Sequence, residues 1–365
     1  MSDFVYCPII KGKANDIKAF AHVNPTLASV VKPLYELPPF KQTDEPETVL
    51  SKFALRLQKF GGNRPSYVDF PLLRPGTRAA SGETALAVAY GQLNMLRVRF
   101  EPVFGFDRDD ALWGIVIAQA RRSGGLLLRL ESDDLEFIHE TIDQILDLRA
   151  RGLDFGLLDV MIDRRALNSD TETMVAASAT ADFIDALHSA VQVRKILVAG
   201  SSAPKTVSGI ERDSYGAISR RELTLWAQVA SERLPVRAIY ADYGVIHPDF
   251  SDQTPSTHIN GKIRYTEGTT LHIYRGHSLR QGDKFEQYRV LSTAVSRSRQ
   301  YQGSSFSYGD RYIYECATGH AGTGNAGTWV LVDQNHHITY TAGQFRRLAE
   351  MAATGSSASQ ILAHA

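Results

Sequence analysis

The segment "GLLLRLESDDLEFIHETIDQILDLRARGLDFGLLDVMID", residues 125–163, contains two short apolar runs separated by a longer amphipathic stretch. Residues 125–132 and 154–163 are rich in Leu, Val and Ile, which predicts two buried strands. Residues 134–152 have the spacing of apolar side chains that is typical of a helix. Because parallel strands need a long crossover, usually a helix, the segment predicts one β–α–β unit.

The same alternation recurs along most of the chain. Strands are predicted at residues 5–10, 31–38, 66–73, 98–106, 125–132, 154–163, 194–202 and 236–244, with helical patterns between them. Eight strand–helix alternations within about 250 residues are typical of a TIM-type barrel. A doubly wound sheet would usually have fewer strands and a glycine-rich phosphate turn after the first, which "PIIKGKAN" lacks. The predicted fold class is therefore α/β, a (β/α)8 barrel.

The segment between the eighth strand and the predicted closing helix "GQFRRLAEMA" is far longer than an ordinary loop of ~2–6 residues. We expect an α+β insertion there, with strands in "KIRYTEGTTLHIYRGHSL", "DRYIYECAT" and "GTWVLVD" and a helix in "KFEQYRVLSTAVSRS". The expected division is barrel at 1–247, cap at 248–341, and closing helix with a polar tail at 342–365. The segment "NHHITY", residues 335–340, would be the last strand of this cap over the barrel mouth.

Composition excludes several classes of protein. Lys plus Arg and Asp plus Glu both number 40, so no strong basic field covers the whole surface. Two cysteines, Cys7 and Cys316, make neither a disulfide framework nor a cysteine-rich zinc site. No signal peptide and no apolar run of the ~20 residues needed to cross a membrane are evident. We expect a cytoplasmic protein without a membrane partner.

Ionisable residues lie at or near the predicted strand ends, where barrel enzymes place their sites. Because lone buried charges are costly, these side chains must pair, bind an ion or face a wet cavity. The polar strand-end residues include Glu101, Glu131, Asp163 and Tyr243. The candidate catalytic residues are Lys11, Glu36, Asp69, Arg129, Asp159, Asp242, His336 and His337.

Two interpretations of these charges are open. In the first, Lys11 and Arg129 face Glu36, Asp69 and Asp159 in an ion-pair ring with no ligand. In the second, Asp69, Asp159 and Asp242 hold Mg²⁺ or Mn²⁺, which prefer oxygen ligands. Such a metal, with Glu36 as base and the two cations stabilising charge, would suit phosphoester hydrolysis. No metal-binding spacing motif strengthens the second interpretation.

Adjacent side chains of a strand point to opposite faces, so at most one of His336 and His337 is expected to face the barrel mouth. That histidine would suit acid–base catalysis or metal ligation, and otherwise the two form a hydrogen-bonded structural pair. The cap also interleaves basic and aromatic residues between 262 and 289, a mixture that can bind single-stranded nucleic acid. Ordinary hairpins favour the same aromatic residues.

Four segments resemble the beta family, which is named after a beta protein of T4-like phage and occurs in bacteria and their mobile elements. They are "YCPIIKGKANDIKAF", "PLYELPP", "YADYGVIHP" and "SYGDRYIYECATG" continuing to "NHHITYTAGQFR". The resemblance implies a barrel-like body and a place in phage–host conflict. The matching positions are Lys11, Glu36, Asp69, Asp159, Asp242, Tyr243, Gly244, His247, Gly309, Asp310, Trp329, Asn335, His336 and His337.

Two hypotheses about function follow. The first is a metal-assisted phosphoesterase or nuclease that acts on nucleic acid or a nucleotide in phage–host conflict. The second is a non-catalytic sensor, inhibitor or partner-binding protein of an anti-phage or counter-defence system, with a phage or defence protein as its partner. Fold alone cannot separate them, because barrels support many functions.

Overall fold

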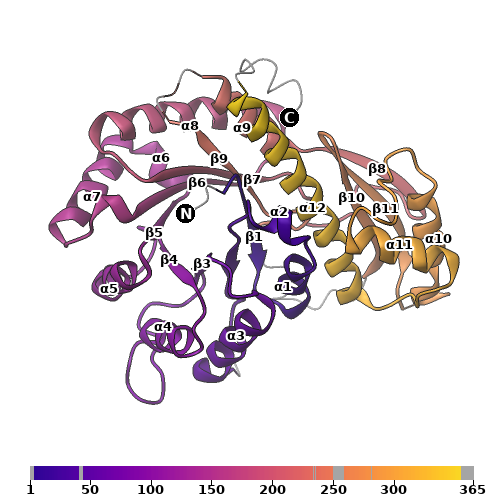
Figure 1. Ribbon diagram of the computed structural model, residues 1–365, viewed down its shortest axis with the longest axis horizontal. Helices are drawn as coiled ribbons and strands as arrows, with labels where there is room; N and C mark the ends of the chain where they lie inside the picture. The colour runs from indigo at the N-terminus through magenta and orange to yellow at the C-terminus, as the bar shows by residue number, and fades with distance from the viewer. Residues whose placement is uncertain are drawn as a thin grey trace.

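A closed barrel of eight parallel strands forms the body of the molecule (Figure 1). The computed structural model describes residues 4–40, 44–232, 234, 236–249, 259–280 and 282–354. The barrel strands, in spatial order, are β1 (Tyr6–Lys11), β2 (Leu34–Glu36), β3 (Ser66–Asp69), β4 (Phe100–Phe104), β5 (Leu126–Leu130), β6 (Leu158–Ala166), β7 (Lys195–Ser201) and β9 (Ala238–Asp242). The prediction of a TIM-type (β/α)8 barrel is confirmed.

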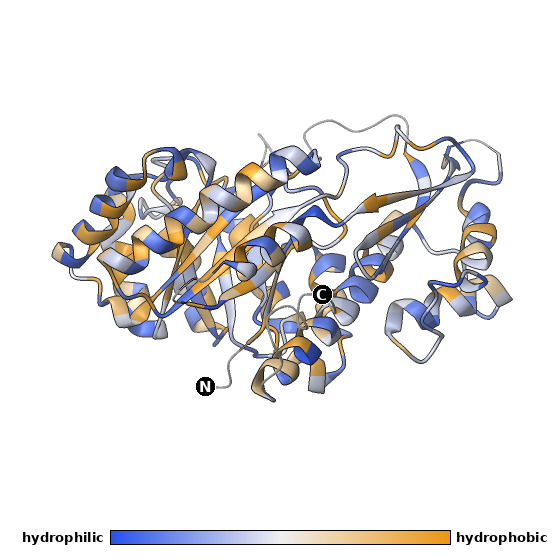
Figure 2. Ribbon diagram, turned by 90° about the horizontal axis from the view of Figure 1, so that it is seen from above, coloured by the Kyte–Doolittle hydropathy of each residue, from blue (hydrophilic) through white to orange (hydrophobic). Residues whose placement is uncertain are grey.

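Helices connect the barrel strands and cover their outer face (Figure 1). They are α1 (Ala14–Ala21), α2 (Pro25–Ala28), α3 (Pro46–Phe60), α4 (Ala85–Met95), α5 (Trp113–Ser123), α6 (Ser132–Glu136), α7 (Ile138–Ala150), α8 (Asp170–Ala190) and α9 (Arg221–Ser231), with short 3-10 turns η1 (Asp110–Leu112) and η2 (Phe155–Leu157). Apolar side chains fill the space between strands and helices, and Figure 2 shows the barrel strands as largely hydrophobic. A second cluster, including Ile9, Leu127 and Met161, fills the barrel itself.

A smaller unit, here called the cap, lies beside the barrel (Figure 1). It contains an antiparallel sheet in the order β10 (Asn260–Glu267), β11 (Thr270–Ser278), β8 (Ser214–Ser219) and the helices α10 (Gln287–Ser296) and α11 (Tyr308–Thr318), with the 3-10 turn η3 (Lys284–Glu286). The sequence predicted the β10–β11 hairpin and the α10 helix. It missed β8, which comes from the loop after β7, so two barrel loops build the cap.

The segment "DRYIYECAT" forms helix α11, so the predicted strand there is wrong. Ser307 caps the helix by accepting a hydrogen bond from the Asp310 backbone N–H, and Gly319 ends it in the left-handed conformation at φ 82°. Both are standard helix boundary residues. Ile313 and Cys316 are buried at helical spacing, which outweighed the strand preference of the tyrosines.

The predicted strands "GTWVLVD" and "NHHITY" are also wrong, because both lie in the long helix α12 (Ala326–Ala353). The closing helix was expected to begin at residue 342. It begins at residue 326 instead, which is 16 residues earlier (342 minus 326), so it crosses the boundary expected at 341. Its first part packs on the cap, and Phe345 in its later part stacks on Tyr240 of the barrel at 4.3 Å between ring centroids. Residues 355–365 of the predicted tail and 250–258 of the predicted insertion lie outside the described residues.

The start of α12 gives a first prediction. The Asn325 side chain accepts a hydrogen bond from the Thr328 backbone N–H at 3.1 Å, and the Thr328 hydroxyl accepts one from the Asn325 N–H at 3.2 Å. Replacement Asn325→Ala removes this reciprocal cap and should lower the free energy of unfolding by about 1 kcal/mol. Asn325→Asp keeps an acceptor and should cost much less in the same urea titration. Equal losses for both variants would contradict the role of the cap.

Within the part of the chain that the structure describes, no helix is both long enough and apolar enough to cross a membrane.

Candidate functional site

Three predicted site residues lie at one level of the barrel, at the carboxyl ends of adjacent strands. The strand register pairs Lys11 of β1 with Glu36 of β2, and Glu36 with Asp69 of β3. Side chains of a parallel barrel alternate between the interior and the outer face. The apolar neighbours Ile9, Leu34 and Tyr67 fill the barrel two positions earlier, so all three charges point inward.

Arg129 of β5 joins this layer as its central cation. Its Nη1 atom donates to Glu36 Oε1 at 2.7 Å and to Asp69 Oδ2 at 2.6 Å. Its Nε and Nη2 atoms donate to Asp163 Oδ2 at 3.0 and 2.6 Å. Lys11 donates to Glu36, and the Tyr243 hydroxyl bonds both Arg129 and Asp163. We call Lys11, Glu36, Asp69, Arg129, Asp163 and Tyr243 the mouth network.

The charges of the mouth network are balanced inside the protein. Arg108 adds a third cation, with its Nη1 atom 3.0 Å from Asp69 Oδ1, so three cations face three carboxylates. Burial alone would raise the pKa of Asp69, but the charges of Arg108 and Arg129 hold this pKa below its usual value. Arg129 and Arg165 likewise outweigh burial and lower the pKa of Asp163. Burial lowers the pKa of Lys11, against the opposing charge of Glu36.

Asp159 does not belong to the mouth network, although it was predicted there. It is the second residue of β6, which extends to Ala166, so it lies at the opposite end of the barrel. Its carboxylate accepts hydrogen bonds from Arg194 Nε at 2.7 Å and from the Tyr67 hydroxyl. Asp163, four residues further along the same strand, occupies the place expected for Asp159. Side chains of a strand alternate between its two faces, so Asp159 and Asp163 lie on the same inward face. Asp163 is two inward positions closer to the carboxyl end of the strand.

Asp242 ends β9 but points outward, toward α12, with its neighbour Tyr243 pointing inward. The carboxylate accepts hydrogen bonds from the Tyr6 hydroxyl at 2.7 Å, the Tyr240 hydroxyl at 2.8 Å and the Gly244 N–H at 3.0 Å. His337 Nε2 lies 2.9 Å away. Burial alone would raise the pKa of Asp242, but His337, Arg220 and the Tyr6 hydroxyl together outweigh burial and the pKa falls to about 2. The carboxylate therefore stays ionised and has four partners.

The two histidines lie on α12 and not on the expected strand, and both are buried. His337 bridges Asp242 of β9 and Thr266 of β10, whose hydroxyl lies 2.7 Å from Nδ1. His336 stacks on Tyr265 at 3.7 Å between centroids. Its Nδ1 lies 2.8 Å from Asp310 and its Nε2 lies 2.8 Å from the Thr266 carbonyl. Both ring nitrogens of His336 therefore have a buried partner.

The magnesium or manganese site expected from Asp69, Asp159 and Asp242 is not assembled by these residues. The first carboxylate is bound to Arg129 and Arg108, the second to Arg194, and the third to His337 and two tyrosines. Among the described residues, no group of three or more His, Cys, Asp and Glu side chains has an arrangement suited to a metal ion. The ion-pair interpretation describes this mouth better, with Asp163 in place of Asp159.

The tyrosines among the basic and aromatic side chains of the cap are buried. Tyr265, Tyr274 and Tyr288 belong to its buried core, and Tyr288 stacks on Trp329 at 4.3 Å between centroids. Arg275 is also buried and donates to the carbonyl of Val207. Buried rings cannot stack on bases, so these tyrosines do not provide the stacking surface of a single-strand binding site.

The sequence missed Arg108 and Arg165, which complete the charges of the mouth. Arg165 adopts φ 52°, and its guanidinium lies 3.3 Å from Glu131 and 3.2 Å from Asp249. Arg108 follows β4, and Arg165 lies near the end of β6. This position at the end of a barrel strand is the only sequence signal that could have identified them. Asp163 and Tyr243 were recognised as polar strand-end residues, but their partner Arg129 lies on another strand, beyond the reach of any local spacing rule.

Solved barrel structures resemble the chain only distantly. A type I 3-dehydroquinate dehydratase from Clostridium difficile has 11% identity, with 69% of this chain and 88% of that chain covered and a TM-score of 0.42. Triosephosphate isomerase from Bartonella henselae has 12% identity, with 66% of this chain and 92% of that chain covered and a TM-score of 0.34. These likenesses carry no argument about activity.

No protein of curated function matches the chain in sequence. A family description does match it: the model for the Beta protein family fits residues 6–343 of the 365. This range includes the whole barrel and most of α12. The chain therefore belongs to the Beta protein family.

Proposed function

We propose that this chain is a non-catalytic recognition protein, in which the barrel is the scaffold and the cap presents the binding surface. The observation that carries the proposal is the charge balance at the mouth. Lys11, Arg108 and Arg129 neutralise Glu36, Asp69 and Asp163 within the protein. Breaking such a buried pair leaves an uncompensated charge, which costs about 3–5 kcal/mol. A substrate or metal would have to meet that cost before any chemistry began.

The alternative is the metal-assisted phosphoesterase or nuclease. It requires several carboxylates to converge on one ion, whereas Asp69, Asp159 and Asp242 each bind a different set of cations. The balance of the geometry therefore favours recognition over hydrolysis. A role in phage–host conflict, with a phage or defence protein as partner, rests on family membership alone and is part of the proposal.

The cap offers surface features suited to a protein partner. Val290 of α10 and Tyr314 of α11 are exposed to 69% and 45%, and Tyr215 of β8 to 48%. Helices α10 and α11 pack on each other, so the first two lie on one neighbouring pair of helices. Exposed aromatic and apolar side chains are typical of protein interfaces.

The test compares two variants in a pull-down from infected and uninfected cells. We expect a stoichiometric partner to be retained by wild type and by Lys11→Met, which changes the mouth, and to be lost by the double variant Val290→Asp and Tyr314→Ser. Circular dichroism and thermal melts verify that both variants are folded. Wild type should not turn over RNA, DNA or nucleotides with Mg²⁺ or Mn²⁺. Turnover that chelation and Lys11→Met both abolish would reverse the assignment in favour of the enzyme.

A further inference from the structure

A cavity of about 700 Å³ lies at the foot of the barrel, where the strands begin. We call it the foot cavity. This volume falls within the roughly 300–1,000 Å³ typical of small-molecule sites. The mouth network lies at the other end of the strands, so the two regions are separate. Barrel enzymes use the mouth, and nothing in the fold itself assigns a site to the foot.

The foot cavity is strongly basic. Among the described residues of its lining, five side chains are cationic and two are carboxylates. The two carboxylates already have partners: Lys32 Nζ lies 2.7 Å from Glu101, and Arg194 Nε lies 2.7 Å from Asp159. Arg64 and Arg99 are the other two arginines of the lining.

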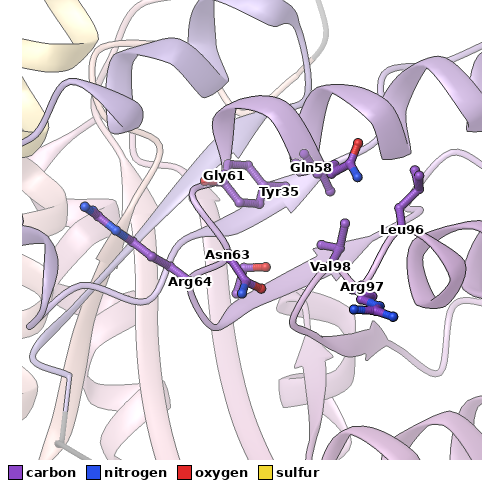
Figure 3. Close-up of a pocket in the computed structure, with 10 residues that line it drawn as sticks. Tyr35, Gln58, Gly61, Asn63, Arg64, Leu96, Arg97 and Val98 are labelled. Atoms are coloured by element: carbon purple, nitrogen blue, oxygen red, sulfur yellow. The ribbon is translucent and has the colours of Figure 1, made fainter.

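Arg64, a residue of this lining, has an unsatisfied hydrogen-bond donor. Its Nη1 atom is buried and makes no hydrogen bond to any residue that the structure describes. Arg64 lines both the foot cavity and the small pocket in Figure 3, where its side chain extends away from Gln58 and Leu96. An unsatisfied buried guanidinium nitrogen is unfavourable, and an anionic acceptor would relieve that cost.

The other walls of the foot cavity are apolar. Phe4, Val31 and Pro65 line it, and the Lys195 ammonium lies 5.6 Å from the centre of the Phe4 ring. Arginine forks suit the planar, bidentate binding of phosphate, and apolar walls suit the ring of a ligand. We propose that the foot cavity binds a small phosphorylated molecule of nucleotide size, with the phosphate at Arg64 and Arg99 and the body against Phe4 and Val31. This inference is independent of the role of the cap.

Isothermal titration calorimetry of the full chain tests the proposal with four probes: ATP, AMP, inorganic pyrophosphate and adenosine. We expect ATP or AMP to bind, and Arg64→Gln and Arg99→Gln each to weaken binding about tenfold, the loss typical of one charged hydrogen bond. Arg97→Gln is the matched control, because it removes the same charge two residues from Arg99 but outside the foot cavity. Ser29→Trp fills the cavity without changing charge and should also abolish binding.

The outcomes separate the sources of the phosphate. Tight binding of ATP or AMP with weak binding of pyrophosphate supports the whole proposal. Pyrophosphate that binds as tightly as ATP supports the anion site but overturns the role of the apolar wall. Binding that Arg97→Gln weakens as much as Arg99→Gln, or binding to none of the phosphorylated probes, overturns the site. A failure here leaves the pull-down test of the cap untouched.

Discussion

Replacing Arg129 by Met should lower the free energy of unfolding at pH 7 by about 3–5 kcal/mol. Arg129 is fully buried and is the one cation that touches Glu36, Asp69 and Asp163 together among the described ion pairs. Methionine fills a similar length but supplies no charge or donor. Among the described ion pairs of these three carboxylates, only those with Lys11 and Arg108 would then remain. Urea unfolding followed by far-UV circular dichroism measures the loss.

Two further variants show whether charge, rather than packing, causes this effect. In the double variant Arg129→Met with Asp163→Asn, one uncompensated carboxylate is removed, so part of the lost stability should return. Arg151→Met removes a cation that pairs with two exposed carboxylates, and we expect little change, because surface ion pairs contribute little. A double variant as unstable as the sum of its single variants would contradict the network.

The same network shows why the sequence predicted the fold better than the site. Short apolar runs separated by helical patterns are local features, so eight barrel strands could be located from them. The level of a side chain within the barrel depends on where each strand starts. An uncertainty of four residues in β6 was enough to exchange Asp163 for Asp159.

The direction of a strand-end side chain is equally hard to predict. Asp242 and Tyr243 are adjacent, so one must face the barrel interior and the other the helix layer. The sequence favoured the carboxylate as the inward residue because of its chemistry. The structure reverses this, since Tyr243 bonds Arg129 inside the barrel, whereas Asp242 bonds His337 on α12.

The first part of helix α12 was missed for a related reason. The segment "NHHITY" contains β-branched and aromatic residues, which favour strands as isolated segments. Its helical state depends on the capping residue Asn325, ten residues upstream of Asn335, and on packing against both the cap and the barrel. Tertiary contacts of this kind override local preference. The histidines accordingly join the two parts of the molecule: His336 contacts the cap and His337 contacts β9.

That junction leads to the second large effect, at Asp242. The folded pKa of Asp242 is about 2, compared with its ordinary value of 3.8. A lowered pKa means that the ionised carboxylate stabilises the fold above about pH 4, and that this stabilisation is lost as the pH falls toward 2. The difference between the two pKa values corresponds to roughly 2 kcal/mol. In Asp242→Asn the amide cannot ionise, so it loses the ion pair with Arg220 and offers His337 no carboxylate charge.

We therefore expect Asp242→Asn to be less stable than wild type by about 2–4 kcal/mol at pH 7, and this gap to narrow steadily below pH 4. Urea titrations of both proteins at several pH values between 7 and 2.5 measure the gap directly, so carboxylates that titrate in both proteins cancel. Asp249→Asn is the control, because Asp249 is half exposed and its ion pairs lie at the surface. A gap for Asp242→Asn that stayed constant down to pH 2.5 would contradict this explanation. The ionised Asp242 carboxylate would then not be the group that stabilises the packing of α12 on the barrel through His337.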